Sequence, residues 1–347
     1  MALLEFVPQG IYCPAAKVYI DPWKPVESAL ITHGHSDHAR WGHQKYLCTH
    51  AALPVIKYRL GDVAIQGIHY NEPIYINGVR FSFHPAGHVP GSAQIRVEYK
   101  GEVWVASGDY KVEPDGLSEP FEPQRCHAFI TESTFGLPIY RWQSQPEIMA
   151  EINTWWKKNK AEGKTSVLVA YSLGKAQRIL ANVDTGIGPV FTHGAVENIN
   201  NVLREQGVVL PETQRVMSSM DKKIFSGGLV IAPPSAFNTP WINRFKPMSL
   251  GIASGWMALR GARRRRAADR GFVLSDHADW EGLNAAIQAT GAEKVFVTHG
   301  YTDIFAQWLR TQGLEAAKVE TQYEGESLDQ VVEEKEHDQE KAIDKAQ

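Results

Sequence analysis

One short stretch of the chain, residues 30–38, constrains its chemistry more than any other. Three histidines and an aspartate (His33, His35, Asp37 and His38) follow an apolar run at residues 28–32. That run is typical of a short buried strand, which a turn at Gly34 would end. Alternate residues of an extended segment point the same way, so His33 and His35 can bind one metal ion. Asp37 and His38, where we expect the chain to enter a helix, can face a second ion. Only 13 of 347 residues are histidine, so three histidines in six positions indicate a metal site rather than a chance polar turn. Imidazole and carboxylate ligands suit zinc.

One loop supplies too few ligands for two ions, so further donors must come from other parts of the chain. His88 lies in a Gly- and Pro-rich loop, Asp109 follows an apolar run at residues 103–105, and His299 follows another at residues 294–298. Loops at strand ends converge on a common rim, where functional side chains gather. Each residue alone could be an ordinary surface residue, but together with the first loop they predict a shared metal site.

Composition places few limits on function but several on location. The chain is 43% hydrophobic and 22% charged, which is typical of an ordinary folded protein of one large domain or two. Its net charge of −3 leaves room for a local basic patch. The three cysteines form neither a disulfide framework nor a CxxC metal motif. We see no signal peptide and no membrane span, so we expect a cytoplasmic protein without a membrane partner.

The secondary-structure pattern changes near residue 145. Before it, short strand-like runs dominate, with one clear helix at residues 51–60; the runs are residues 17–20, 28–32, 79–84, 94–99, 103–107 and 128–132. After it, strands alternate with helices up to a strand at residues 250–254, which predicts a doubly wound parallel unit. From residue 324 the chain is mostly charged and is predicted to be a disordered tail or a lone exposed helix.

The order of these motifs resembles a known fold family. Asp21 in Tyr-Ile-Asp-Pro, the HxHxDH loop, His88 and Asp109 resemble the metallo-β-lactamase fold. Three further residues resemble motifs A, B and C of its β-CASP nuclease branch, and they are Glu132, His277 and His299. The stretches at residues 10–14 and 20–23, with the chain length, are similar to the bacterial DNA-ligase-associated exonucleases, which are Artemis-like.

This resemblance implies an α+β fold, a four-layer αββα metallo-β-lactamase sandwich with an inserted α/β β-CASP cap domain. It divides the chain into residues 1–144 and 256–323 for the metallo-β-lactamase domain, 145–255 for the cap and 324–347 for the tail. It also implies two Zn²⁺ sites, with Mn²⁺ as an alternative metal. His33, His35 and His88 would bind one ion, Asp37, His38 and His299 the other, and Asp109 would bridge them.

The same resemblance implies roles around the metal ligands. Two ions would clamp the scissile phosphate and lower the pKa of a shared water toward about 7. His277, oriented by Glu132, would act as the general acid, because a carboxylate partner selects the ring tautomer and raises the basicity of the ring. Asp21 would hold the ligands in place, and its alternative interpretation is an ordinary turn aspartate.

Two segments near the cap resemble the DNA-acting branch. Residues 170–175 resemble its YSxGK segment and residues 254–256 its (S/T)GW segment, in which the lysine and the hydroxyl help to form a terminal-phosphate pocket. Ser172, Lys175 and Ser254 are therefore candidate substrate-binding residues. A helix that begins near Gly174 would also favour an anion. The alternative for Lys175 is a solvated helix lysine.

A basic run follows, with arginines at positions 260 and 263–266; the candidate backbone-binding residues are Arg260, Arg263, Arg264, Arg265 and Arg266. Such a run is typical of contact with a phosphate backbone, although a solvated basic loop has the same composition.

The sequence thus predicts a metal-dependent DNA exonuclease of repair that acts on single strands or ends beside a DNA ligase. A β-CASP ribonuclease is the first alternative, because RNA-processing members usually carry histidine at motif C whereas eukaryotic Artemis-type nucleases usually carry valine. A non-catalytic nucleic-acid-binding subunit is the second alternative, and the full set of ligands argues against it.

Overall fold

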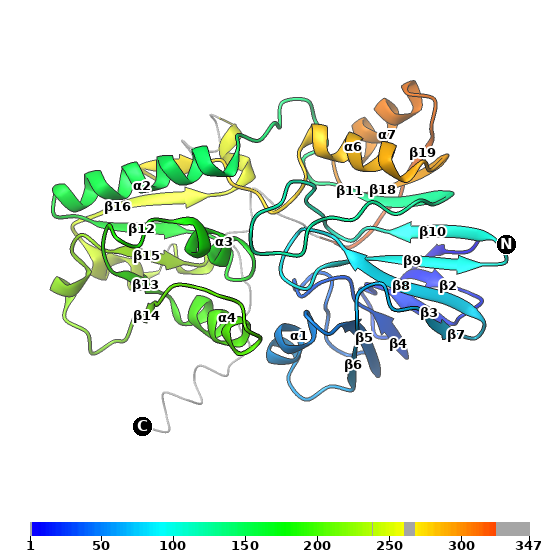
Figure 1. Ribbon diagram of the computed structural model, residues 1–347, viewed down its shortest axis with the longest axis horizontal. Coiled ribbons are helices and arrows are strands. Elements are labelled where there is room, and N and C mark those ends of the chain that lie inside the picture. The colour runs from blue at the N-terminus through cyan, green and yellow to red at the C-terminus, as the bar shows by residue number, and fades with distance from the viewer. Residues whose placement is uncertain (1, 238, 260–267, 324–347) are drawn as a thin grey trace.

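The structure is a computed structural model that describes residues 2–237, 239–259 and 268–323. It forms two lobes, of which the green and yellow one in Figure 1 corresponds to the middle of the chain. The predicted backbone-binding arginines at 260 and 263–266 and the predicted disordered tail at 324–347 lie outside the described residues.

The first sheet holds six strands in chain order, antiparallel up to β3 and parallel from β3 onward. Its strands are β1 (Glu5–Val7), β2 (Gly10–Cys13), β3 (Val18–Ile20), β4 (Ser28–Leu30), β5 (Lys45–Thr49) and β6 (Ile65–Ile68). The HxHxDH loop begins shortly after β4. In that loop the chain forms a turn, with Ala39 N–H donating to the carbonyl of His35 at 2.8 Å, and not the start of the helix that the sequence predicts. The next helix is α1 (Leu53–Leu60).

The second sheet holds seven strands in the order β19-β18-β11-β10-β9-β8-β7. They are β7 (Ile74–Ile76), β8 (Val79–Pro85), β9 (Ala93–Tyr99), β10 (Glu102–Ala106), β11 (Ala128–Ser133), β18 (Lys294–Gly300) and β19 (Glu315–Lys318). Strands β10, β11 and β18 are parallel, and β8 runs in the same direction because β9 is antiparallel to both β8 and β10. The carboxyl ends of β8, β10, β11 and β18 therefore lie at one edge of the sheet, which is where the candidate ligands follow.

The two sheets pack on each other through a buried apolar cluster that includes Ile20, Leu30, Phe81 and Ile95. Helix α1 packs on the other side of the first sheet, where Ile56 belongs to a cluster with strand residues of β4 and β5. Helices α6 (Trp280–Thr290) and α7 (Thr302–Thr311) cover the second sheet in the same way. Burial of these apolar side chains, at about 25 cal/mol per Å² of apolar surface, is the main favourable term that holds the layers together.

The second lobe contains an all-parallel sheet in the order β14-β13-β15-β12-β16-β17. Its strands are β12 (Thr165–Val169), β13 (Val190–Thr192), β14 (Gln214–Arg215), β15 (Leu229–Ala232), β16 (Met248–Ala253) and β17 (Arg270–Phe272). The helices are α2 (Gln145–Ala161), α3 (Lys175–Asn182) and α4 (Gly194–Glu205). The predicted cap boundary at residue 255 falls before β17, the last strand of this sheet. Strand β15 lies in the interior of the sheet, between β13 and β12.

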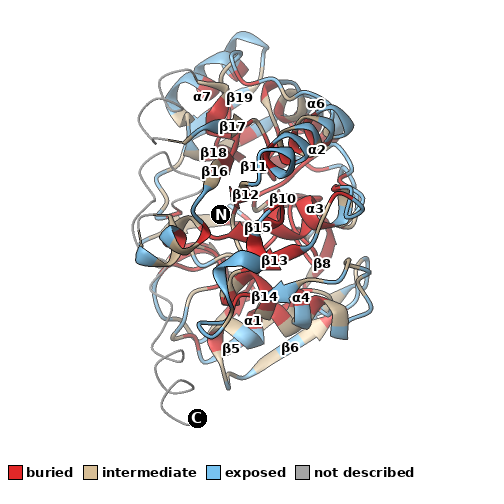
Figure 2. Cartoon of the chain, turned by 90° about the vertical axis from the view of Figure 1, so that its left-hand side faces the viewer, coloured by how far each residue is buried: buried red, intermediate tan, exposed pale blue. Residues whose placement is uncertain are grey.

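Burial follows these layers, as Figure 2 shows, with buried residues along the strands and exposed residues on the outward side of helix α2. Contact between the lobes includes an apolar cluster in which Val55 of α1 meets Leu173, and Ile199 and Leu203 of α4. None of the helices in the described part of the chain has the length and apolar character needed to span a membrane.

Candidate metal centre and active site

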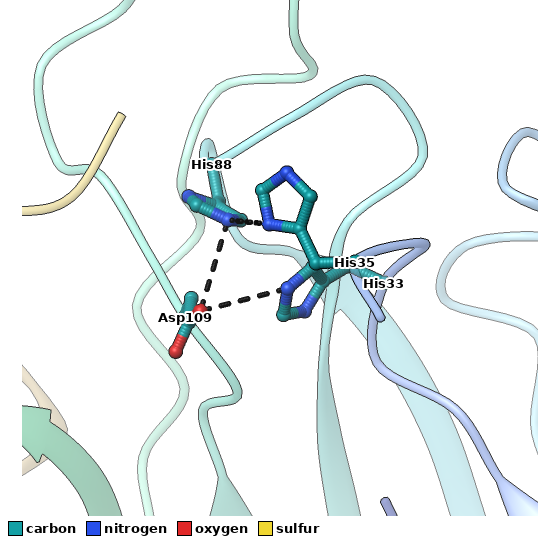
Figure 3. A group of neighbouring side chains, drawn as sticks. All are labelled: His33, His35, His88 and Asp109. Carbon is teal, nitrogen blue, oxygen red and sulfur yellow. Dashed lines mark hydrogen bonds and ion pairs between the residues drawn. The ribbon is translucent and has the colours of Figure 1, made fainter. Parts of the chain in front are cut away.

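Four predicted ligands from three loops meet in one group, drawn in Figure 3. His33 and His35 follow β4, His88 follows β8, and Asp109 follows β10; one ligand atom from each lies within 4.8 Å of the others. Oδ2 of Asp109 lies 3.5 Å from Nε2 of His33 and 3.8 Å from Nε2 of His88. Nε2 of His88 is 3.0 Å from Nδ1 of His35. We call this set the first metal group.

Asp109 belongs to a second group as well, with His38 and His299, whose ligand atoms also lie within 4.8 Å of one another. Its Oδ1 lies 3.0 Å from Nε2 of His299, and its Oδ2 lies 3.5 Å from Nε2 of His38. The carboxylate of Asp37 is 3.7 Å from Nε2 of His38 and so lies beside this second metal group. The position of Asp109 between the groups would allow its carboxylate to bridge two ions.

The ligand atoms themselves indicate that a cation belongs here. Nε2 of His33, Nε2 of His38, Nε2 of His299 and Oδ1 of Asp109 are buried and form no hydrogen bond in the described part of the chain. The 3.0 Å contact between His299 and Asp109 does not have the geometry of a hydrogen bond. Buried polar atoms are rarely left unsatisfied, because desolvation without a partner costs free energy. Four such atoms in one small volume, from imidazoles and a carboxylate, fit divalent metal ions.

Asp21 fixes the positions of Thr32 and His38 next to the metal groups. Its Oδ1 accepts from the backbone N–H of Thr32 at 2.8 Å, and its Oδ2 lies 2.7 Å from Nδ1 of His38. The Thr32 hydroxyl also donates to Asp21 and lies 3.1 Å from Nδ1 of His33. Nδ1 of His38 is thus occupied, and its Nε2 faces Asp109. Gly108, at φ +57°, allows the Asp109 loop to approach closely, because a Cβ there would lie 2.6 Å from the Thr32 hydroxyl.

Burial and neighbouring charges shift the pKa values of the candidate ligands. Burial lowers the pKa of His33 and of His88 well below the ordinary value, assisted by the neighbouring histidines, so both imidazoles are neutral and each offers a lone pair. Burial alone would raise the pKa of Asp109, but His38 and His299 outweigh it and hold that pKa well below the usual range. The first metal group therefore presents neutral imidazole nitrogens and an ionised carboxylate. Burial would lower the pKa of His38 in the second metal group, but Asp109, Asp37 and Asp21 outweigh it and raise that pKa well above the ordinary value.

His277 and Glu132 form a buried pair beside the first metal group. Nδ1 of His277 lies 2.8 Å from Oε2 of Glu132, and the His277 ring centroid lies 4.7 Å from that of His88. Glu132 is held in turn, since its Oε1 accepts from the Tyr110 N–H at 2.8 Å and its Oε2 accepts from the Thr134 hydroxyl at 2.6 Å. A fixed carboxylate on Nδ1 leaves Nε2 as the atom of His277 that can exchange a proton with a substrate.

The second lobe reaches the site through helix α3. Its Lys175 Nζ lies 3.8 Å from one oxygen of Asp276, and its Arg178 guanidinium lies 3.4 Å from the other. The carbonyl of Asp276 in turn lies 2.9 Å from Nδ1 of His88. Burial would raise the pKa of Asp276, but Lys175 and Arg178 lower it below the usual value. Gly174, at φ +89°, permits this approach, because a Cβ there would lie 2.4 Å from Val89.

The predicted substrate-binding residues belong to none of the metal groups, although the carbonyl of Leu173, the residue after Ser172, lies 3.3 Å from Nε2 of His35. Lys175 is only 1% exposed and faces Asp276. Ser172, just before α3, is partly buried, and its carbonyl accepts from the Gln177 amide at 2.9 Å. Ser254 follows β16 and its hydroxyl accepts from the Trp256 N–H at 3.2 Å, which caps a 3₁₀ turn. The structure therefore brings the metal ligands, Asp21, Glu132 and His277 together and places these three residues around α3 and β16.

Four residues at the site carry no prediction from the sequence, and they are Thr32, Arg178, Asp276 and Tyr323. Thr32 could have been noticed as a hydroxyl between an apolar run and the first ligand. Asp276 directly precedes His277, but nothing in the sequence indicates that it meets Arg178. Tyr323, whose hydroxyl donates to the carbonyl of Asp21 at 3.0 Å, lies 302 residues further along the chain. Contacts over such separations exist only in the folded molecule.

Comparison with known proteins gives several relatives, although no protein-family model matches the chain. The chain is 30% identical over 313 residues to the protein named Probable DNA ligase of Opitutus terrae, covering 88% of this chain and 30% of that protein. It is 26% identical over 212 residues to Endoribonuclease YSH1 of Mycosarcoma maydis, covering 49% and 24%. It is 23% identical over 207 residues to an RNase J-like protein of Methanocaldococcus jannaschii, covering 50% and 48%. The chain thus spans between a quarter and a half of the length of these relatives.

The fold is similar to a crystal structure of a protein of unknown function from Enterococcus faecalis V583, with a TM-score of 0.54 at 10% identity, over 78% of this chain and 74% of that one. This fold, the relatives above and the ligand geometry together define the class of protein. The chain belongs to the β-CASP nucleases of the metallo-β-lactamase family.

Proposed function

We propose that this protein is a metal-dependent DNA exonuclease that hydrolyses phosphodiester bonds from strand ends during repair. One observation carries the proposal, which is that Asp109 belongs to the first and second metal groups and also has a ligand atom within 4.8 Å of ligand atoms of the paired Glu132 and His277. Two metal sites with an adjacent proton donor suit phosphodiester hydrolysis.

The arrangement of layers supports this assignment. Helix α1, the two sheets and helices α6 and α7 fit a four-layer αββα sandwich, and the parallel unit of β12 to β17 fits an inserted β-CASP cap. The metal groups lie at the strand ends where the second lobe meets the sandwich, through Lys175, Arg178 and Asp276. A strand of nucleic acid could therefore be bound by both lobes.

In this proposal Asp109 bridges two ions, Zn²⁺ or alternatively Mn²⁺, of which His33, His35 and His88 bind one and Asp37, His38 and His299 the other. Bound divalent ions would supply Lewis acidity toward the scissile phosphate and lower the pKa of a water toward neutrality. The protein contributes the positions of these side chains, which Asp21 and Thr32 hold through His38 and His33.

His277 is the proposed general acid. In its protonated form, Nδ1–H donates to Glu132 and Nε2–H passes its proton to the leaving oxygen as the phosphorus–oxygen bond breaks. Glu132 keeps the ring in this orientation and stabilises its positive charge, because its second oxygen is held by the Tyr110 N–H.

The choice of DNA and of strand ends rests on two arguments. The relative named Probable DNA ligase matches this chain over 30% of its own length, which supports a functional link between a nuclease of this kind and a ligase. Ser172, Lys175 and Ser254 are proposed to form a pocket for a terminal phosphate, for which Lys175 would exchange its contact with Asp276 for the phosphate. The arginines at 260 and 263–266 are proposed to contact the phosphate backbone of the nucleic acid without sequence preference.

A ribonuclease is the second candidate, since His299 belongs to the second metal group and relatives of this chain are named endoribonuclease YSH1 and RNase J-like protein. The test uses linear single strands of DNA and RNA of one sequence, end-labelled and with a 5′-phosphate or a 5′-hydroxyl, and compares them with internally labelled circular strands of the same sequence. The chelated protein is supplied with Zn²⁺ or Mn²⁺. We expect stepwise digestion of linear DNA and survival of the circles.

Asp109→Ala should abolish this digestion, because it removes the ligand common to both metal groups, whereas Asp303→Ala, an exposed surface aspartate paired with Lys318, should retain it. Equal cleavage of circular and linear DNA would refute the exonuclease. Preferential cleavage of RNA would favour the ribonuclease. Wild-type rates in Asp109→Ala would refute the metal site itself.

A further inference from the structure

The aromatic ring of Tyr323 lies directly against a predicted metal ligand. Its ring is parallel to the imidazole of His38, with centroids 4.4 Å apart and planes inclined by 9°. Its edges meet His299, with centroids 5.6 Å apart at 79°, and Trp23, with centroids 5.5 Å apart at 82°. Tyr323 is 8% exposed. Two of the three aromatic partners of this ring are therefore members of the second metal group.

The backbone that precedes Tyr323 is held by two different elements of the site. Val319 N–H donates to the carbonyl of Val297 at 2.8 Å, which continues the pairing of β19 with β18. Arg40, two residues after His38, donates to the carbonyl of Asp37 at 3.1 Å and to the carbonyl of Gln322. The segment is thus tied to the strand that carries His299 and to the loop that carries Asp37 and His38.

These contacts restrict the orientation of His38. Asp21 holds its Nδ1 at 2.7 Å, and its Nε2 faces Asp109 at 3.5 Å. Rotation of the imidazole about its bond to Cβ would move Nε2 away from Asp109, and it would also break the stack on Tyr323. Groups that orient a metal ligand contribute strongly to metal affinity, because a ligand that is already in place loses less freedom on binding.

The first metal group is oriented by other contacts. The rings of His35 and His88 lie edge to face at 4.8 Å, and His88 is held by the carbonyl of Asp276. The ring contacts of Tyr323 described above involve only the second group. His38 itself lies against His33 of the first group, with ring centroids 4.2 Å apart, so a change at Tyr323 should act directly on the second group and only indirectly on the first.

We propose that Tyr323 is a positioning residue of the second metal group, whose stacked ring holds His38 in the orientation that binds an ion together with Asp109 and His299. This inference rests on the proposed two-metal site. It concerns the affinity of one site for its ion, and a direct measurement of metal binding can test it without any nuclease assay.

The experiment titrates chelator-treated full-length protein with Mn²⁺ and with Zn²⁺ by calorimetry, and counts the ions retained after dialysis. We compare wild type with Tyr323→Ala, Tyr323→Leu and Tyr323→Phe, and with Tyr75→Ala, a control at a tyrosine that is 69% exposed. Wild type and the control should bind two ions. Tyr323→Ala should weaken one of them by about 10- to 100-fold, the range typical of groups that orient a ligand, and weaken the other much less.

The other two variants separate the ring from folding and from the hydroxyl. Tyr323→Phe keeps the stack and should bind both ions like wild type. Tyr323→Leu keeps a buried apolar side chain without an aromatic ring, so it should also weaken one ion even if the alanine variant fails to fold. Unchanged affinities in both the leucine and alanine variants, or equal weakening of both ions, would overturn the inference. A phenylalanine variant as weak as alanine would assign the effect to the hydroxyl bond with Asp21 and would overturn it as well.

The same titration separates this inference from the proposed function. Wild type that binds two ions but degrades no DNA would refute the exonuclease while leaving the role of Tyr323 to be decided by its variants. Wild type that binds fewer than two ions would refute the two-metal site and the inference together.

Discussion

At the scale of single residues, the site depends on two histidines in which a carboxylate holds one ring nitrogen and the other ring nitrogen is left for metal binding or proton transfer. Asp21 holds Nδ1 of His38, and Glu132 holds Nδ1 of His277, so that in both rings Nε2 is the second nitrogen available for chemistry. In the first case Nε2 faces a predicted metal ligand, and in the second it is the proposed proton donor. Two chemically similar histidine–carboxylate pairs thus serve different proposed roles because their rings face different neighbours.

The role of His277 can be separated from metal binding. His277→Ala should lower the rate of cleavage by about 10²- to 10⁴-fold, the usual cost of removing a general acid, while the number of bound ions stays the same. Single-turnover cleavage and metal analysis of the same preparation measure both quantities. The control is His69→Ala, at an exposed histidine outside the site. Loss of metal together with activity would instead make His277 a ligand.

At the scale of elements, helix α3 connects the two lobes at the site. Its first turn presents Lys175 to Asp276, and the next turn presents Arg178 to the same carboxylate and to the carbonyl of Ser275. Both cations are nearly fully buried, so the interaction is little screened by solvent. The segment 275–277, which carries His277 and the carbonyl that holds His88, is therefore fixed by a helix of the other lobe.

This arrangement makes Arg178 a test of the contact between the lobes. Arg178→Ala should lower the free energy of unfolding by about 3 kcal/mol, at the low end for a broken buried ion pair, because Lys175 still faces Asp276. Arg270→Ala removes an ion pair with Glu151 in which both side chains are about half exposed. It should lower the free energy of unfolding by less than about 1 kcal/mol. Urea denaturation in excess chelator measures both. Equal losses in the two variants would contradict the buried contact.

At the scale of the whole molecule, a chain of net charge −3 is proposed to bind a polyanion. That is possible if positive charge is concentrated locally, as in the arginine run at residues 263–266. Such a run would bind any strand through its phosphates, and each phosphate that is bound releases counterions, so that affinity falls as salt rises.

Neutralising part of this run tests its role. Arg263→Gln with Arg264→Gln should weaken binding to 5′-phosphorylated and 5′-hydroxyl strands equally. The slope of log affinity against log salt should become shallower by about 0.7 for each phosphate of a single strand that the variant no longer binds. Fluorescence anisotropy in the presence of chelator measures binding without cleavage. Lys157→Gln with Lys158→Gln on α2 makes the same change of charge and should leave the slope unchanged; an equal effect there would point to net charge alone.

The sequence by itself determined what depends on neighbouring positions. The HxHxDH spacing indicated paired ligands, because alternate residues of an extended segment share a side. His88, Asp109 and His299 were predicted because each follows an apolar run typical of a strand. That β8, β10 and β18 run in one direction is known only from the structure. The pairing of His277 with Glu132 came from resemblance to a family, since no spacing rule joins residues 145 positions apart.

Only the tertiary structure decided which of these groups share an atom or a neighbour. Asp109 lies between two metal groups because the order of strands places its loop between those of His88 and His299. Tyr323 stacks on His38 because β19 pairs beside β18 at the edge of the second sheet, which directs the following residues back across the ligand loop. Local patterns report which face of a strand or helix a side chain occupies. Contacts across hundreds of residues are set by strand order and the packing of layers, which no local pattern encodes.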